Sequence, residues 1–182
     1  MTTSSHRLGR YRKIEVVPTE FRGHGQYGDF NHMIRLKEYE NTIFLFNDNF
    51  LQWAQALQFP QIQQGSGGGN AAIRPYEVEG KSMGIPTGPF PSLKDIYEIR
   101  GQTFTVAQII EMAFDRILRH CLKNDHIKTI FYSAAPGSDV IGLGIFSGVV
   151  GQDVIKRITE TLRNLQEMFR KRRLHYVDYC NV

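Results

Sequence analysis

The sequence feature that most constrains the fold is a continuous apolar run over residues 42–46, Thr-Ile-Phe-Leu-Phe, which ends in Asn47-Asp48-Asn49. A run without polar alternation is typical of a strand buried on both faces, and such strands belong mainly to parallel sheets covered by helices. Ligands of open α/β sheets bind outside the carboxyl ends of the strands. The run therefore predicts an α/β domain with three polar residues at the edge where ligands bind.

Further apolar patterns extend this run into an alternation of strands and helices. Residues 14–17 form a β-branched run stopped by Pro18, which predicts an edge strand. Thr105 and Gln108 fit a capping box at the start of an apolar helical stripe. We expect further strands over residues 82–87, 127–134 and 174–180, and helices over residues 50–57, 105–122 and 152–172. The alternation predicts a three-layer α/β/α domain with a central mixed, mostly parallel sheet.

Length, charge and cysteine content narrow the class of protein. The 182 residues suit a single domain over residues 14–182, preceded by a basic, aperiodic lead-in over residues 1–13. The net charge of +4 gathers in this lead-in and in the consecutive bases 170–173, so the body is mildly acidic. No apolar run is long enough to span a membrane, and two cysteines cannot build a disulfide framework. We expect a cytoplasmic protein without a membrane partner, and the basic ends leave a nuclear location as the alternative.

Two glycine-rich stretches, residues 65–70 and 141–148, each precede an expected helix. Glycine lets backbone N–H groups approach an anion closely, and a helix N-terminus adds a positive dipole end that suits a phosphate. Two such loops at one edge would grip a diphosphate from both sides. A flexible linker is the alternative for the first stretch, whereas the apolar residues between the glycines of the second favour a nucleotide loop.

These stretches resemble the macrodomains, a family that binds ADP-ribose. The resemblance rests on the strand ending in Asn47-Asp48-Asn49, on Gly67-Gly68-Gly69-Asn70 opening a helix, and on Gly142-Leu143-Gly144-Ile145-Phe146-Ser147-Gly148 before the last long helix. It extends in order and spacing over residues 40–172. The family usually has Asn-Ala-Ala-Asn at the first of these motifs, a shorter spacer before the glycines and one residue fewer in the last loop. The chain therefore resembles a divergent branch.

The resemblance implies roles for individual residues. Those that would bind the diphosphate and distal ribose are Asn47, Gly67, Gly68, Gly69, Asn70, Gly142, Gly144, Ile145, Phe146 and Gly148, with Phe146 lying against the ribose and Asn47 or Asn49 bonded to its hydroxyls. Asp29, within Gly28-Asp29-Phe30, is the candidate for binding the adenine amino group. No metal or other cofactor is implied, and the spacing of the histidines matches no recurrent set of metal ligands.

Asp48 has two interpretations. Its carboxylate, with Asn49 beside it, would orient a nucleophilic water at the distal ribose as a general base. Alternatively, Asp48 caps the helix expected to begin near Phe50. The sequence leaves both open.

Three functions follow from these motifs. The first is binding of ADP-ribose, or a related NAD-derived nucleotide diphosphate, with hydrolysis of an ADP-ribosyl linkage by Asp48 and Asn49. The second is a non-catalytic reader that binds or sequesters ADP-ribose, either free or attached to a protein partner. The third is an RNA-binding module that uses the basic ends, with an affinity that falls steeply as salt rises.

Overall fold

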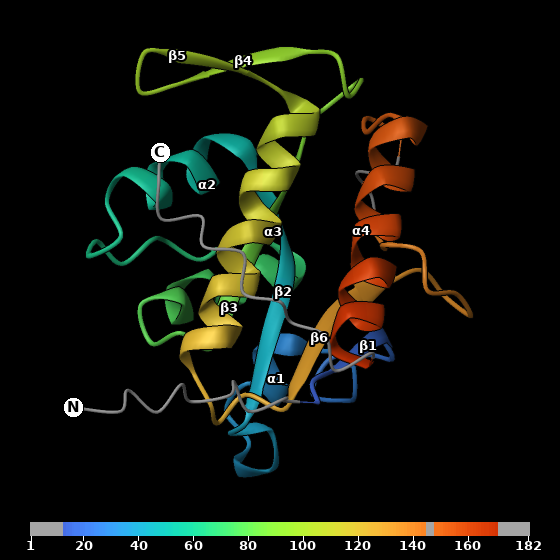
Figure 1. The fold of residues 1–182 in the computed structure, drawn as a ribbon. Coiled ribbons are helices and arrows are strands. Elements are labelled where there is room, and N and C mark those ends of the chain that lie inside the picture. The colour runs from blue at the N-terminus through green and yellow to red at the C-terminus, as the bar shows by residue number, and fades with distance from the viewer. Residues whose placement is uncertain (1–12, 145–147, 171–182) are drawn as a thin grey trace, which may run out of the picture.

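The computed structural model describes residues 13–144 and 148–170, which form an α/β fold around a four-stranded parallel sheet (Figure 1). The spatial order of the strands is β1-β6-β2-β3. Their bounds are Glu15–Glu20 (β1), Thr42–Asn49 (β2), Ser82–Gly88 (β3) and Thr129–Ala134 (β6). The α/β prediction is confirmed, but the sheet described is wholly parallel rather than mixed.

Helices pack against both faces of the sheet. The larger core lies against α2 (Phe50–Gln58), α3 (Val106–Lys123) and α4 (Gln152–Arg170), and the smaller one against α1 (Phe30–Met33), η1 (Lys37–Tyr39) and η2 (Gly69–Glu77). Because side chains alternate along a strand, β2 contributes Ile43 and Leu45 to the larger core and Phe44 and Phe46 to the smaller one. This double burial explains the continuous apolar run.

Aromatic rings fill the smaller core in place of long helices. Phe44 contacts Phe30 and Phe131 edge to face, with centroids 5.1 and 5.6 Å apart, and Tyr39 joins the same cluster. Such T-shaped contacts stabilise a core beyond the area that they bury. The short helical turns on this face thus cover β2 without adding a full helical layer.

Two local predictions were wrong in their bounds. Pro18 lies inside β1, opposite Tyr132, rather than ending it. It is tolerated because β1 is an edge strand, as predicted, and the outer side of an edge strand needs no N–H donors. The polar residues Asn47, Asp48 and Asn49 likewise belong to β2 and do not follow it.

Other elements match or add to the predictions. The capping box of Thr105 and Gln108 starts α3 as expected. A hairpin of β4 (Ile96–Ile99) and β5 (Gln102–Thr105), which we did not predict, lies beyond the start of α3 in Figure 1. The lead-in before residue 13 and the strand expected over residues 174–180 lie outside the described residues. Among the described residues, no helix has the length and apolar character needed to cross a bilayer.

Candidate functional site

The carboxyl ends of the four strands define one edge of the sheet, and the predicted site residues lie on the segments around it. We call residues 65–70 the first glycine loop and residues 135–151 the second glycine loop. The first leads into η2 and the second connects β6 to α4. Residues 145–147 of the second loop, including the predicted Ile145 and Phe146, lie outside the described part of the chain.

Ser133, near the end of β6, joins the two glycine loops. Its Oγ accepts a hydrogen bond from Asn70 Nδ2 at 3.1 Å, and its carbonyl accepts one from the Gly142 N–H at 3.0 Å. The Gly142 carbonyl in turn accepts a bond from Asn47 Nδ2 on β2. Three predicted residues, Asn47, Asn70 and Gly142, therefore come together through a serine that was not among the predicted site residues.

Asn70 also connects the first glycine loop to the segment after β1. Its Oδ1 accepts the Phe30 N–H at 3.1 Å, which brings the adjacent Asp29 to the same edge. The Asp29 carboxylate accepts the Gly25 N–H at 2.8 Å. Gly28 is confined to glycine by a φ of +92° and by the Glu20 carbonyl, which would collide with any side chain. The segment carrying Asp29 is therefore held tightly beside Asn70.

The glycines of the first loop serve different purposes. A Cβ at Gly67 would lie 2.8 Å from Ala71 Cβ and 3.0 Å from the Arg74 guanidinium, and Gly69 has a φ of +55°. The fold itself thus favours glycine at both positions. At Gly68 the φ is −80° and a Cβ would have no atom within 4 Å, so this position faces open space.

The second loop divides in the same way. A Cβ at Gly142 would lie 2.7 Å from the carbonyl carbon of Ala134, so this glycine permits close packing on β6. Gly144 has a φ of +56°, and both Gly144 and Gly148 have open space where a side chain would be. In each loop, then, some glycines pack against the protein and others border open space.

The Asp48 carboxylate is not exposed at this edge. Asp48 is 1% exposed and lies on the same face of β2 as Phe46, against η2. Its Oδ1 accepts hydrogen bonds from Arg74 Nε at 3.0 Å and from Arg74 Nη2 at 2.6 Å. Burial raises the pKa of Asp48, although the Arg74 guanidinium opposes that shift. In this arrangement the carboxylate does not meet open space where a nucleophilic water would lie.

Asn49 takes the capping role that we considered for Asp48. Its Oδ1 accepts the N–H groups of Leu51 at 2.9 Å and Gln52 at 3.4 Å, and α2 begins at the next residue. The capping interpretation of Asp48 was therefore wrong by one residue. Because strand alternation turns Asp48 inward, it turns Asn49 outward, where it can reach the free N–H groups of the helix.

Two further ionisable residues near Asp48, the buried Arg74 and the half-buried Glu77, were not predicted. Arg74 is 2% exposed, and its Nη1 donates to the Gly65 carbonyl at 2.9 Å. Glu77 Oε1 accepts the Gly84 N–H at 2.8 Å, and burial raises the pKa of Glu77 to about 7 from its ordinary 4.5. Residues three apart align along a 3₁₀ helix, so the spacing of Arg74 and Glu77 was the only sequence signal that they share a face.

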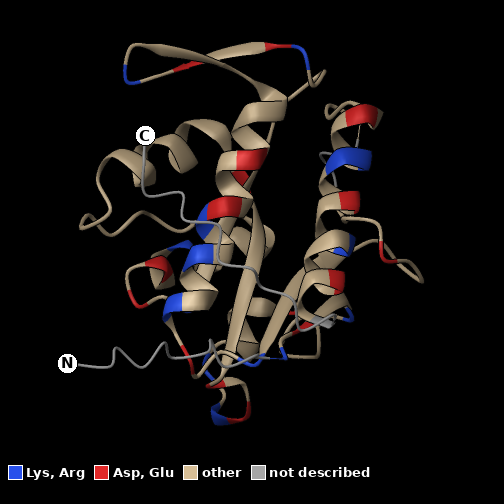
Figure 2. Ribbon diagram, in the orientation of Figure 1, with Lys and Arg blue, Asp and Glu red and all other residues tan. Residues whose placement is uncertain are grey.

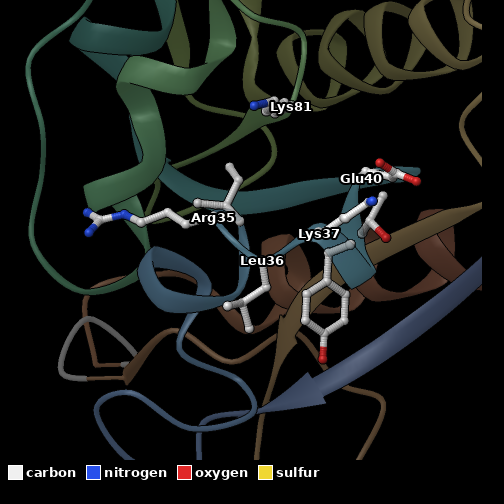
Figure 3. Close-up of a pocket in the computed structure, with 8 residues that line it drawn as sticks. Arg35, Leu36, Lys37, Glu40 and Lys81 are labelled. Atoms are coloured by element: carbon white, nitrogen blue, oxygen red, sulfur yellow. The ribbon is translucent and has the colours of Figure 1, made fainter.

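Two hollows elsewhere in the described structure do not offer a better site. One of about 200 Å³ lies at the opposite edge, near Thr42 at the start of β2 (Figure 3). In Figure 3 the Arg35 side chain extends away from those of Lys37 and Glu40, so the charged groups do not converge on one point. A smaller hollow of about 80 Å³ lies beside Glu77. The described residues contain no group of three or more histidine, cysteine or acidic side chains that could hold a metal ion.

Comparison with protein-family models gave no match, and comparisons with curated proteins and with solved structures gave none either. What the chain does must therefore be inferred from its own residues.

Proposed function

We propose that the chain binds ADP-ribose, or a closely related nucleotide diphosphate, between the two glycine loops at the carboxyl edge of the sheet. The observation that carries this proposal is the series of hydrogen bonds from the Phe30 N–H through Asn70, Ser133 and Gly142 to Asn47. It draws together segments far apart in the sequence at the edge where α/β sheets bind ligands. A site of this kind needs such fixed loops, because the ligand would be held by backbone groups.

The proposed contacts follow from the open glycines. Gly68 and Gly69 on one side, and Gly144 and Gly148 on the other, have no neighbouring atom where a side chain would stand. Their N–H groups would reach a diphosphate without steric obstruction. Asp29, held next to Asn70, would face the adenine. We propose on these grounds that the fold is macrodomain-like, with each glycine loop leading from the strand edge into a helix.

Hydrolysis is not part of this proposal. The Asp48 carboxylate is buried and paired with Arg74, and the Asn49 side chain is occupied as the cap of α2. Neither group is left to activate a water at the edge. The function that the site supports best is therefore a non-catalytic one, in which ADP-ribose is bound either free or attached to another protein.

Calorimetric titration of the full chain with ADP-ribose tests the proposal, with AMP and NAD as comparisons. We expect a dissociation constant of about 1 μM for ADP-ribose and weaker binding of AMP, which lacks the second phosphate and the distal ribose. Gly68→Ala places a methyl group in the proposed path of the diphosphate and should weaken binding about tenfold. Gly65→Ala is the matched control, because it adds the same methyl to the same loop, also in open space. Equal affinities of the two variants, or no binding by the wild type, would refute the proposal.

Salt dependence separates this function from RNA binding. In Figure 2, acidic and basic residues alternate along α4, whereas the acidic residues of α3 lie in its first half and the basic ones in its second, so neither helix carries basic residues along its whole described length. Most of the bases at the two ends of the chain lie outside those residues. Binding to backbone N–H groups should weaken only slightly with added salt, whereas a phosphate backbone held by the basic ends would release counterions and show a steep dependence.

A further inference from the structure

A buried ion pair lies beneath the first glycine loop, and stability alone does not account for it. Asp48 and Arg74 are almost completely buried, with Nη2 and Oδ1 2.6 Å apart. The solvation lost by two buried charges often exceeds what their attraction returns, so apolar residues of similar volume can be as stable in the same place. The other contacts of Arg74 indicate what else the pair does.

Arg74 donates in two directions. Nε and Nη2 both donate to Asp48 Oδ1 on β2, whereas Nη1 donates to the Gly65 carbonyl at 2.9 Å. The other carboxylate oxygen, Asp48 Oδ2, has no hydrogen-bond partner within the described part of the chain and lies against Gly84, where a Cβ would be only 2.7 Å away. With both bonds falling on Oδ1, the guanidinium keeps a donor for the loop. Its planar, rigid fork then fixes the direction of that donor.

The first glycine loop is shaped around this guanidinium. Gly67 packs so closely on Arg74 that a Cβ would lie 3.0 Å from each of its two terminal nitrogens. The loop then closes on itself, since the Gly67 N–H donates to Ala71 and the Ala71 N–H donates to Gly68, at 3.0 and 3.1 Å. Gly68 and Gly69 thus take their positions from a turn that rests on Arg74.

We propose that Asp48 and Arg74 are positioning residues, which hold the first glycine loop at the carboxyl edge so that the Gly68 and Gly69 N–H groups face a nucleotide diphosphate. The ligand in this inference rests on the proposed function, whereas the loop-holding role depends only on the contacts within the chain. Neither residue touches the ligand. Asp48 orients Arg74, and Arg74 holds the loop.

Arg74→Lys tests the inference, because it keeps the positive charge and loses the fork. Hydrogen exchange of the full chain without ligand should show the Gly67 and Ala71 amides exchanging about tenfold faster, with much smaller changes for amides in the centre of β2. The affinity for ADP-ribose should fall by a similar factor. Ile158→Val is the matched control, because it removes a methylene from the core under α4, away from the loop. It should lower global stability without selectively exposing Gly67 and Ala71.

A second variant separates positioning from stabilisation. The double substitution Asp48→Val and Arg74→Met replaces the pair with apolar residues, which buried sites of this kind often tolerate. The fold should persist, but the bond to the Gly65 carbonyl is gone. We expect the Gly67 and Ala71 amides of this variant to exchange faster than in the wild type, and its affinity for ADP-ribose to stay below that of the wild type. Were the pair only a stabilising contact, both would return toward wild-type values as stability returned.

The outcomes distinguish the two proposals. Unchanged exchange of Gly67 and Ala71 in both variants would overturn the positioning role, whatever the ligand data. Faster loop exchange with an unchanged affinity for ADP-ribose would overturn it as well, because the loop would then not need to be held for binding. If the wild type binds no ADP-ribose, the proposed function fails, and the exchange data alone still decide whether the pair holds the loop.

Discussion

The two glycine loops reach the same edge of the sheet but are held there by different kinds of contact. The first rests on a buried ion pair, whereas in the second Gly142 donates one neutral hydrogen bond, accepts another and packs closely on Ala134. The second loop also has an ion pair, since Arg163 Nε and Nη2 donate to the two Asp139 oxygens at 2.6 and 2.7 Å, but that pair is exposed. Both loops thus have an ion pair nearby, and the two pairs differ in burial. We expect this difference in burial to decide how strongly each pair stabilises its loop. Stability at the first loop should therefore depend on the charges of nearby side chains and on pH. Stability at the second loop should depend on the volume of the side chains that pack there.

Removing the arginine of each ion pair, Arg74 on η2 or Arg163 on α4, should give the largest difference. Arg74→Met leaves the Asp48 carboxylate buried and unpaired, which should lower the free energy of unfolding by about 3–5 kcal/mol. Arg163→Met frees Asp139 to water and should have little effect, because exposed pairs contribute little. Urea denaturation of both variants makes the measurement. A similar loss of unfolding free energy in the two variants would mean that burial does not distinguish the two ion pairs.

The free energy of unfolding should depend on pH through Glu77. This residue ends η2, the helix into which the first glycine loop leads. Its pKa is raised from 4.5 to about 7, mainly by burial, with Asp48 adding to the shift and Arg116 and Arg74 opposing it. The folded state therefore favours the protonated carboxyl. The protonated carboxyl therefore contributes up to about 3 kcal/mol to the free energy of unfolding. This contribution is fully present below pH 4.5 and is lost as pH rises through about 7.

Glu77→Gln tests this linkage, since it keeps an oxygen for the Gly84 N–H and cannot ionise. The variant should be more stable than the wild type above pH 7 and should show a flatter profile between pH 4.5 and 7. Urea denaturation across that range checks it. Parallel profiles for the two proteins would show that Glu77 does not titrate with folding.

Added volume should affect the second loop. Gly142→Ala would push a methyl group against the backbone of Ala134 and should lower the free energy of unfolding by about 1–3 kcal/mol. Gly148→Ala, in the same loop, meets no atom within 4 Å and should leave stability unchanged. Thermal denaturation of the two variants compares them. An equally stable Gly142→Ala protein would mean that the loop can move away from β6 without loss.

Ser133 contacts both loops, so its side chain should have the smallest and most selective effect. Ser133→Ala removes the bond from Asn70 but keeps the carbonyl that accepts the Gly142 N–H. We expect a loss of about 0.5–1.5 kcal/mol and faster hydrogen exchange in the first loop only. Faster exchange in the second loop as well would show that the two loops are coupled more strongly than their separate contacts suggest.

Most of the fold could be predicted because residue patterns within single segments are enough to identify its main strands and helices. The apolar run of β2 indicates a buried strand, and the capping box and apolar face of α3 indicate a helix. Neither pattern depends on the rest of the chain. The β4–β5 hairpin also had a local signal that we did not use. Arg100 and Gly101 both have positive φ, 53° and 76°, as a two-residue type I′ turn requires, and such turns favour a glycine.

The site could be predicted only in part, for a physical reason. Asn47 lies near the end of β2, Asn70 at the start of η2 and Gly142 in the loop after β6, and a parallel sheet brings such positions to one edge. The Asp48–Arg74 pair spans 26 positions and forms only because η2 packs with Arg74 facing β2. No local pattern specifies that face. Asp48 was therefore recognised as unusual, but its partner and its buried role were not.

The most direct test of a single site formed by both loops is an amide NMR titration of the full chain with ADP-ribose. The resonances of Gly68 and Gly69 should shift together with those of Gly142 and Gly144, at the same ligand concentration. Those of Lys37 and Lys81, at the hollow on the opposite edge, should stay in place. Shifts at Lys37 and Lys81 with both loops unchanged, or shifts in one loop alone, would mean that the two glycine loops do not form one ligand site.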